Sequence, residues 1–177
     1  LSPTDWSRDG RHLAFTAFDP ASGTDVMVVP LSGDRKPTPI ARTSFNEADG
    51  RFSPDGRWIA YISNESGKDE VYVTRFPELG RKWQVSQGEA VGGFVWRANG
   101  TEVIYSTQTN EVRAVEVDGR GATFQVGKVQ VLVAESPAIG ADLTPDGQRF
   151  LIVSATEVTK PTPLTLVVNW PAILKRQ

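Results

Sequence analysis

The chain has 177 residues, 39% of them hydrophobic, with 16 glycines, 12 prolines and no cysteine. The lack of cysteine excludes disulfide bonds, thiol catalysis and cysteine-based zinc sites. With a formal net charge of −2, Lys and Arg scattered among the acids and no apolar run near the roughly 18 residues of a membrane span, we expect no nucleic-acid partner and no membrane insertion by this segment.

One short pattern occurs four times along the chain. The copies are Trp6-Ser7-Arg8-Asp9-Gly10, Phe52-Ser53-Pro54-Asp55-Gly56, Trp96-Arg97-Ala98-Asn99-Gly100 and Leu143-Thr144-Pro145-Asp146-Gly147. Their glycines lie 46, 44 and 47 residues apart (10 to 56, 56 to 100, 100 to 147). A fixed period of about 40–50 residues is typical of propellers built blade by blade.

The sequence therefore predicts an all-β fold, a β-propeller segment of four blades with three to four antiparallel strands each. We expect one propeller region over 1–177, with repeats near 3–43, 45–87, 90–134 and 137–170 and a tail over 171–177. The chain begins Leu1-Ser2-Pro3 without Met or a signal peptide, so we expect it to be a piece of a longer polypeptide.

Each repeat starts with two strands joined by a tight turn. The residue four positions before each Gly is apolar, and three consecutive apolar residues follow each Gly, which predicts a second strand buried on both faces. These triplets are Leu13–Phe15, Ile59–Tyr61, Val103–Tyr105 and Phe150–Ile152. We expect Trp6, Phe52 and Trp96 in the core.

The turn residues are Asp9 and Gly10, Asp55 and Gly56, Asn99 and Gly100, and Asp146 and Gly147. Gly supplies positive φ and Asp or Asn bonds nearby backbone N–H groups. Catalytic carboxylates work as a pair with different pKa values, so carboxylates repeated once per blade indicate a structural role.

Third strands are predicted over Asp25–Leu31, Glu70–Phe76, Glu111–Val117 and Leu164–Trp170, and shorter fourth strands over Thr38–Thr43, Trp83–Gln87 and Gln130–Ala134. The last repeat has no outer strand. Open blade edges pair readily with other strands, so a larger parent propeller, self-association into a dimer-completed ring and an open arc all remain possible.

No residue of the chain is predicted to be catalytic, and no metal site or cofactor is expected. His12, the only histidine, lies beside a turn and should face solvent, and no Gly-x-Ser-x-Gly motif accompanies it. The segment Asn46–Gly50 is the most metal-like cluster, but Phe45 and Gly56 occupy the first and twelfth positions where a helix-flanked calcium loop needs Asp and Glu.

We expect the segments that lead into the inner strands to gather at the mouth of the central channel. The candidate ligand-binding residues there are Asp5, Asn46, Glu47, Asp49, Glu89 and Asp142. Because this set is mildly acidic, it favours a cation or a basic peptide over an anion.

The stretch Arg51–Tyr61, followed by Ser63–Gly67, resembles the WD-repeat-like propellers of the TolB type. The similarity is closer still to the C-terminal propeller regions that follow the kinase domain in acidobacterial serine/threonine protein kinases. Three further stretches share it: Leu31–Pro37, Gly80–Ser86 and Pro163–Trp170.

This resemblance implies a non-catalytic binding or scaffold module, a sensory or protein-interaction domain of a bacterial receptor-like kinase on the extracytoplasmic side. Its partner would be a protein or a small ligand of unspecified identity. The Gly-rich loop, catalytic loop and Asp-Phe-Gly motif of a kinase do not occur in these residues. The alternatives are a TolB-like periplasmic protein-interaction propeller and the propeller of a prolyl-oligopeptidase-like hydrolase whose catalytic residues lie elsewhere.

Overall fold

The structure is a computed structural model that describes residues 1–21, 23–88, 91–134, 138–143 and 149–154, with the backbone alone over 138–143 and 150–154. The predicted turn at Asp146 and Gly147, the strand at Leu164–Trp170 and the tail lie outside the described residues, as does Glu89. The described part of the chain contains no helix of the length and hydropathy that crossing a bilayer requires.

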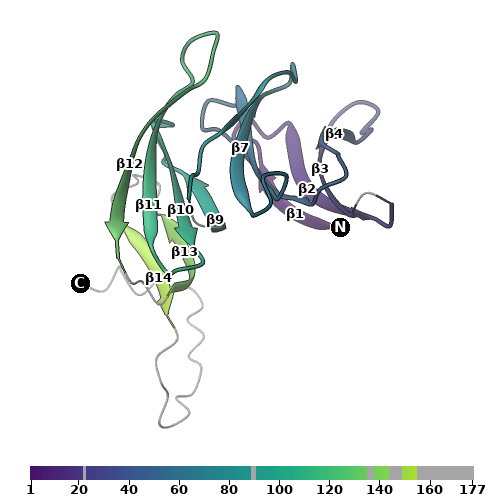
Figure 1. Cartoon of the computed structure of the whole chain (residues 1–177). Helices are drawn as coiled ribbons and strands as arrows, with labels where there is room; N and C mark the ends of the chain where they lie inside the picture. Colours follow the sequence, from purple (N-terminus) through teal and green to yellow (C-terminus); the bar gives the residue numbers. More distant parts are fainter. Residues whose placement is uncertain (22, 89–90, 135–137, 144–148, 155–177) are drawn as a thin grey trace, which may run out of the picture.

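The described residues form three four-stranded antiparallel sheets and one two-stranded sheet, each in sequence order (Figure 1). Blade 1 contains β1 (Ser2–Trp6), β2 (His12–Asp19), β3 (Gly23–Pro30) and β4 (Thr38–Ala41). Blade 2 contains β5 (Glu47–Phe52), β6 (Trp58–Ser63), β7 (Glu70–Arg75) and β8 (Lys82–Gln84). Blade 3 contains β9 (Val91–Trp96), β10 (Glu102–Thr107), β11 (Val112–Asp118) and β12 (Gln125–Val133), and β13 (Ala138–Leu143) pairs with β14 (Phe150–Ser154).

The first hairpin has the same register in all four sheets. The residue four positions before the turn glycine pairs with the third residue after it, in the pairs Trp6↔Leu13, Phe52↔Ile59, Trp96↔Val103 and Leu143↔Phe150. Gly10, Gly56 and Gly100 have φ values of 72°, 71° and 73°, a region that favours glycine. The predicted all-β repeat architecture is therefore confirmed.

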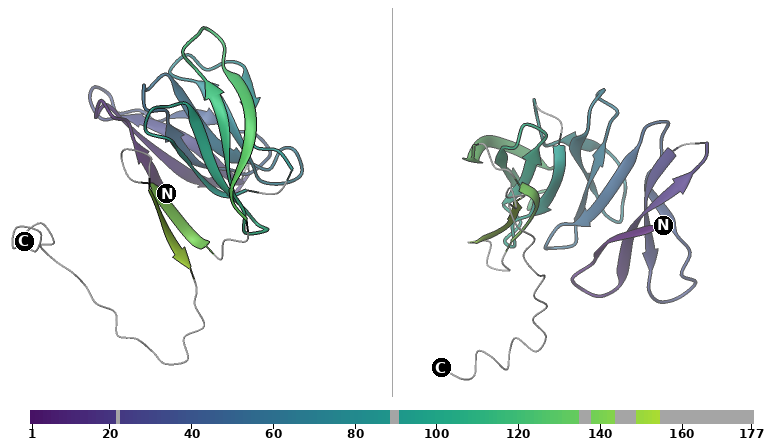
Figure 2. Two further views of the ribbon diagram at one scale, coloured as in Figure 1. Left: turned by 90° about the vertical axis from the view of Figure 1, so that its left-hand side faces the viewer. Right: turned by 90° about the horizontal axis from the view of Figure 1, so that it is seen from below.

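The sheets stand side by side in an arc, with their first strands innermost (Figure 2). β5 contacts β1 on one side and β9 on the other, and β9 also contacts β13. The inner strands of successive blades therefore line the concave side of the arc, as they do around a propeller axis.

The largest apolar cluster lies between blades 2 and 3 and includes Trp58, Val73, Val103 and Tyr105. All three residues of the β6 triplet Ile59–Tyr61 and of the β10 triplet Val103–Tyr105 are buried, as the pattern predicts for a sheet covered on both faces.

Blade 1 departs from the expected burial. In β2 only Ala14 of the triplet is buried, and Trp6 is 59% exposed, so the expectation of a core Trp6 is wrong. Ala14, Val26 and Val28 pack toward blade 2, whereas Trp6 and its partner Leu13 point to the opposite face. That face is covered by no other sheet in the described part of the chain.

All three predicted outer strands differ in extent from the prediction, and β4 ends at Ala41 instead of Thr43. β12 begins at Gln125 instead of Gln130, because β11 and β12 pair along their whole length with two irregularities in register. β8 spans Lys82–Gln84 instead of Trp83–Gln87. Beyond it, the Val85 N–H donates to the Val71 carbonyl at 2.8 Å, and the Ser86 hydroxyl accepts a hydrogen bond from the Val71 N–H at 2.7 Å.

Candidate functional site

The antiparallel strand order places the connections of each blade alternately at two ends. The first and third connections of blades 1–3 lie at one end, which we call the turn end because it carries the Asp-Gly turns: segments 7–11, 31–37, 53–57, 76–81, 97–101 and 119–124. The connections between successive blades lie at the opposite end.

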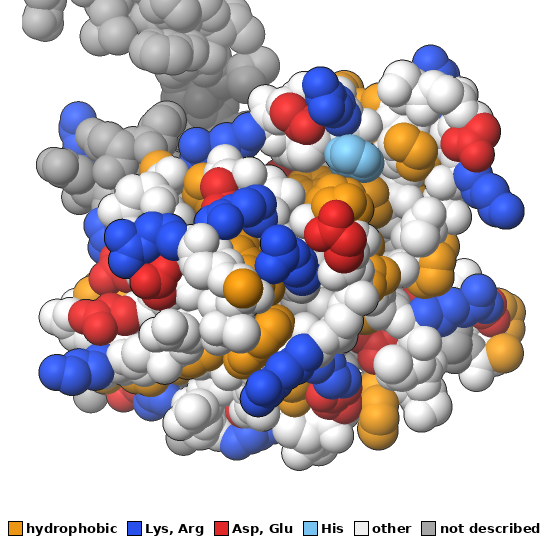
Figure 3. Space-filling model, turned by 90° about the horizontal axis from the view of Figure 1, so that it is seen from above, with side chains coloured by type: hydrophobic (Ala, Val, Ile, Leu, Met, Phe, Trp, Pro, Cys, Tyr) orange, Lys and Arg blue, Asp and Glu red, His pale blue; other side chains and the backbone are white. Residues whose placement is uncertain are grey.

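Basic side chains outnumber acidic ones at the turn end. Its segments carry Arg8, Arg11, Arg35, Lys36, Arg57, Arg81, Arg97 and Arg120, against Asp9, Asp34, Asp55 and Glu78. Figure 3 looks onto this end, with the single histidine in pale blue and Lys and Arg side chains spread across the face. Eight of the 19 Lys and Arg residues lie in these segments, in a chain whose net charge is negative.

The turn aspartates are bound by their own loops. The Oδ1 atom of Asp9 accepts hydrogen bonds from the Ser7 hydroxyl (2.7 Å) and the Arg11 N–H (3.0 Å), and these bonds, the hydroxyl first, lower the pKa of Asp9. Asp55 has the equivalent bonds from Ser53 (2.6 Å) and Arg57 (3.1 Å). Burial, the largest single influence, pushes the pKa of Asp55 upward, but these hydrogen bonds and the Arg57 charge together hold it below the usual value.

Asn99 takes the aspartate position in blade 3. Its Oδ1 atom accepts hydrogen bonds from the N–H (3.1 Å) and the hydroxyl (2.8 Å) of Thr101. A neutral amide therefore supplies the same acceptor, and the turn needs no charge at this position.

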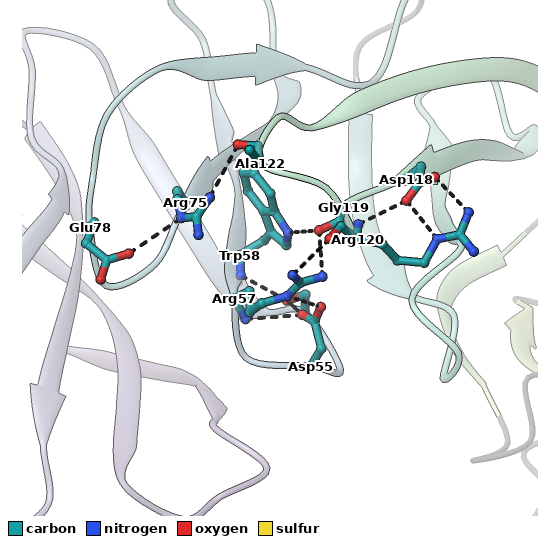
Figure 4. A network of polar contacts seen from close by, with 10 residues as sticks. Asp55, Arg57, Trp58, Arg75, Glu78, Asp118, Gly119, Arg120 and Ala122 are labelled. Carbon is teal, nitrogen blue, oxygen red and sulfur yellow. Dashed lines mark hydrogen bonds and ion pairs between the residues drawn. The ribbon is translucent and has the colours of Figure 1, made fainter.

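Blade 2 holds the β11–β12 loop of blade 3 by a set of bonds at the turn end (Figure 4). The Gly119 carbonyl accepts hydrogen bonds from Trp58 Nε1 (2.9 Å) and Arg57 Nη2 (2.7 Å), and the Arg120 carbonyl accepts one from Arg57 Nη1 (3.1 Å). The Arg57 Nε also pairs with Asp55 Oδ2 at 2.8 Å. The Arg57 guanidinium thus links its own turn to the neighbouring blade.

Aromatic packing supports the same joint. The Trp58 ring lies 5.0 Å from Phe124 and 5.6 Å from Trp83, centroid to centroid. Arg75 lies over the Trp58 ring at 5.7 Å and donates a hydrogen bond to the Ala122 carbonyl at 3.3 Å. The joint between blades 2 and 3 is therefore built from both apolar and polar contacts.

Two of the clefts at the turn end lie between blades. One, with a volume of about 280 Å³, lies between blades 2 and 3 and is lined by Trp58, Trp96 and Phe124 among others. The other, of about 560 Å³, lies between blades 1 and 2 and is lined by His12, Phe52 and Phe76 among others. Arg8, Pro54 and Asp55 line both clefts.

The sequence led us to expect a His12 that faces solvent, and the structure places it half-buried in the open cleft between blades 1 and 2. Its ring is half-buried, 5.0 Å from the Phe76 ring and 6.3 Å from the Phe52 ring. As the first residue of β2, it points to the same face as Ala14, which packs on blade 2. The sequence analysis did not predict the aromatic cluster of Phe52, Phe76 and His12. Phe76 follows the third strand of blade 2, whereas His12 belongs to blade 1, so the two are far apart in the repeat pattern.

Two of the predicted ligand residues, Asp5 and Asp49, are close enough for their charges to interact. Asp5 Oδ2 accepts a hydrogen bond from the Phe52 N–H at 2.8 Å and Oδ1 accepts one from the Trp6 N–H at 2.8 Å. Burial raises the pKa of Asp5 despite these bonds and the nearby Arg51, and the negative charge of Asp49 adds to the increase.

Arg51 joins these inner-strand residues, although the sequence analysis did not single it out. Its Nε lies 3.2 Å from Asp49 Oδ1, and its carbonyl accepts a hydrogen bond from Trp96 Nε1 at 3.2 Å. Counted from the turn glycine, Arg51 is equivalent to Asp5, so this column of the repeat alignment places opposite charges on adjacent inner strands. The opposite charges of Asp5 and Arg51 at this repeat position could have identified Arg51 from the sequence.

Asn46 and Glu47 lie at the other end of β5, away from Asp5. Glu47 is 1% exposed, and its carboxylate accepts hydrogen bonds from the Thr43 hydroxyl and N–H and from Ser63. The Asn46 N–H donates to Asn64 Oδ1 at 2.9 Å. These side chains join segments at the end opposite the turns, and the six candidates do not form one cluster.

The structure describes only the backbone of the candidate Asp142 and does not describe the candidate Glu89. Asp142 pairs with Leu151 in the backbone ladder of β13 and β14, and Glu89 lies outside the described residues. Over the residues described with side chains, no three His, Cys, Asp or Glu side chains gather in a way that could hold a metal ion.

Comparison with known proteins identifies the fold class. No family model and no curated protein matches the sequence. TolB from Acinetobacter baumannii matches with a TM-score of 0.62 at 18% identity, over 88% of this chain and 38% of that chain. Oligogalacturonate lyase in complex with manganese matches with a TM-score of 0.62 at 11% identity, over 89% and 47%. The β-propeller domain of Cps50 (Swd1) from Myceliophteria thermophila matches with a TM-score of 0.60 at 16% identity, over 93% and 55%.

The chain is thus a β-propeller segment of the kind found in TolB and Cps50, and it spans between 38% and 55% of these three proteins. The neighbours include a lyase as well as TolB. The shared architecture therefore defines a scaffold that carries different activities, and function has to be argued from the site.

Proposed function

We propose that this segment is a non-catalytic binding or scaffold module that engages a partner at its turn end. The proposal is carried by the side chains that line the two clefts between blades at the turn end. Both clefts are open and lined by aromatic rings and by Arg8. Asp9 and Asp55, which also line them, are hydrogen-bonded within their own turns.

The proposal extends to the larger context. The stretches Arg51–Tyr61, Leu31–Pro37 and Gly80–Ser86, and the similarity to TolB, support an extracytoplasmic sensory or protein-interaction domain of a receptor-like serine/threonine kinase. A TolB-like periplasmic propeller and the propeller of a prolyl-oligopeptidase-like hydrolase are the competing contexts. Contact of Asp5 and Asp49 with a cation on the inner strands stays a prediction.

Photo-crosslinking tests the binding role. A benzophenone amino acid placed at Thr101, on the rim of the cleft between blades 2 and 3, is compared with the same group at Gln130 on β12. We expect a defined protein adduct from cells of the source organism for position 101 and none for position 130. Adducts of equal yield at both positions would contradict a turn-end partner surface.

Turnover assays test the non-catalytic role. The purified chain is assayed with ester, lactone, peptide and oligouronide substrates, and we expect no turnover. Turnover that falls in an Asp5→Asn variant of unchanged melting temperature would overturn the proposal. The complete reading frame discriminates the contexts, since kinase motifs upstream support the first and an α/β-hydrolase domain supports the last.

A further inference from the structure

We infer that the cleft between blades 1 and 2 at the turn end binds an acidic peptide segment that carries one apolar side chain. This inference rests on the proposed function and names the chemistry of the partner. It is carried by three features of the cleft: its aromatic floor, the cations on its rim, and the internal bonding of its carboxylates.

The floor of the cleft is formed by three rings. Phe76 lies 5.2 Å from Phe52 and 5.0 Å from His12, and the cleft has a volume of about 560 Å³. Phe52 is 6% exposed, while Phe76 and His12 are half-buried and reach the cleft. An apolar side chain of a ligand would be removed from water against these rings, which is the main source of binding free energy for a non-polar group.

Arg8 on the rim is not required by the turn on which it stands. The equivalent positions in the next two repeats are Pro54 and Ala98, and those turns form with the same positive φ at glycine. Arg8 is exposed, lines the cleft, and has no described carboxylate within ion-pair distance. Its charge is therefore available to a ligand.

The second rim cation is held only weakly. Arg11 Nε lies 3.8 Å from Asp9 Oδ2, and the Arg11 side chain is 77% exposed. Exposed pairs of this kind contribute little and exchange partners readily. A carboxylate of the ligand can therefore compete for Arg11.

The carboxylates on the rim face their own loops. Asp9 accepts hydrogen bonds from Ser7 and Arg11, and Asp55 accepts them from Ser53 and Arg57. These bonds hold one oxygen of each carboxylate in its own turn, although both aspartates also line the cleft. A bound anion would lie beside the exposed Arg8 and Arg11 rather than beside these carboxylates.

The charges of the neighbouring loops favour a peptide over a nucleic acid. Arg35, Lys36 and Arg81 are exposed and extend the basic surface beyond the cleft. However, Asp34 and Glu78 lie in the same two loops, and the surface lacks the continuous row of cations that a phosphate backbone needs. An acidic peptide, with carboxylates at irregular spacing, matches this pattern.

Fluorescence polarisation of the whole chain with a labelled eight-residue peptide tests the inference. The probe contains Asp and Glu with one central Phe, and its controls replace Phe by Ala or the acids by Lys. We expect Arg8→Glu to weaken binding by about tenfold or more, because the change reverses a charge at the contact. The matched control Lys128→Glu, an equal charge change on exposed β12, should stay within about twofold.

Replacing the central Phe of the probe by Ala should also weaken binding by about tenfold, and higher salt should weaken it further. Equal losses in both charge variants, equal binding of the Lys peptide, or preferred binding of single-stranded oligonucleotide would overturn the inference. Circular dichroism melting of each variant verifies that the fold is intact.

The two proposals fail in different ways. A crosslinked partner at Thr101 combined with no binding of the acidic probe would leave the binding role and remove the acidic-peptide inference. Substrate turnover by the purified chain would remove the binding role whatever the probe does.

Discussion

At Gly119 the backbone of blade 3 lies close against the aromatic side chain of Trp58 in blade 2. A Cβ atom at this position would lie 2.4 Å from Trp58 Nε1 and 2.9 Å from Trp58 Cδ1. The Gly119 carbonyl accepts hydrogen bonds from Trp58 and Arg57 in the same place. A side chain would therefore force the two blades apart at their polar joint.

We expect Gly119→Ala to lower the free energy of unfolding by about 1–3 kcal/mol, the usual cost of inserting a methyl group into a closely packed site. Gly121→Ala, in the same loop, is the matched control, since its added Cβ would lie no closer than 3.8 Å to another atom outside its chain neighbours. Urea unfolding of both variants measures the difference. Equal stabilities would show that the loop does not pack on Trp58.

Asp118 and Asp5 have pKa values shifted in opposite directions for different physical reasons. Hydrogen bonds from the Arg120 side chain and N–H lower the pKa of Asp118 to about 2. Burial raises the pKa of Asp5 above its usual value of 3.8. Asp118 therefore stabilises the folded state when it is charged, whereas Asp5 stabilises it when it is protonated.

The pH dependence follows from these directions. The contribution of Asp118 is present above its unfolded pKa and is lost as the pH falls through its folded pKa, whereas that of Asp5 is present below its unfolded pKa and is lost as the pH rises through its folded pKa. Carbon-13 NMR titration should give a midpoint near 2 for Asp118 and one above 3.8 for Asp5. Arg120→Ala should move only the Asp118 midpoint upward, and a shift of both would contradict the assigned causes.

The first position of the repeated pattern plays a different part in each blade. Phe52 in β5 is 6% exposed, Trp6 in β1 is 59% exposed, and Trp96 in β9 is half-buried with its Nε1 bonded to the Arg51 carbonyl. The strand register is the same in all three. What differs is whether another blade covers the face to which the side chain points.

We expect Phe52→Ala to cost about 3–5 kcal/mol of unfolding free energy, as a large-to-small change in a core does. Trp6→Ala, the equivalent position in blade 1, should cost less than about 1 kcal/mol because the side chain is mostly in water already. Chemical denaturation of the two variants provides the comparison. A loss for Trp6→Ala as large as that for Phe52→Ala would mean that its face is covered in solution.

The repeat pattern predicts strands and turns because both are local. The Asp-Gly turns, the hairpin register and the buried triplets of β6 and β10 follow from residues a few positions apart. The exposure of Trp6 and the partial burial of His12 depend on which blade lies against which face, and the pattern contains no such information. The cleft between blades 1 and 2 could not be predicted from the pattern either, because its floor is formed by residues of two repeats, His12 and Phe76.

Across the whole molecule, blade 2 is the only one of the first three sheets that is described with a full blade on each side. Its strands β6 and β7 are almost entirely buried, with Ile59, Ala60 and Val73 at 0% exposure. Blade 1 has the same number of strands and the same hairpin register, but Leu13 and Phe15 remain half-exposed. In a repeat array, stability is the sum of each unit and its interfaces with neighbours.

Amide hydrogen exchange should therefore be slowest in β6 and β7 and at least tenfold faster in β2, because local opening of blade 1 disrupts one interface and that of blade 2 disrupts two. Mass spectrometry of exchanged peptides over 12–19 and 58–63 gives the comparison at low protein concentration. If copies associate through the open face of blade 1, protection of 12–19 will rise with concentration while that of 58–63 stays constant. Equal protection of both segments at every concentration would show that stacking between blades does not determine stability.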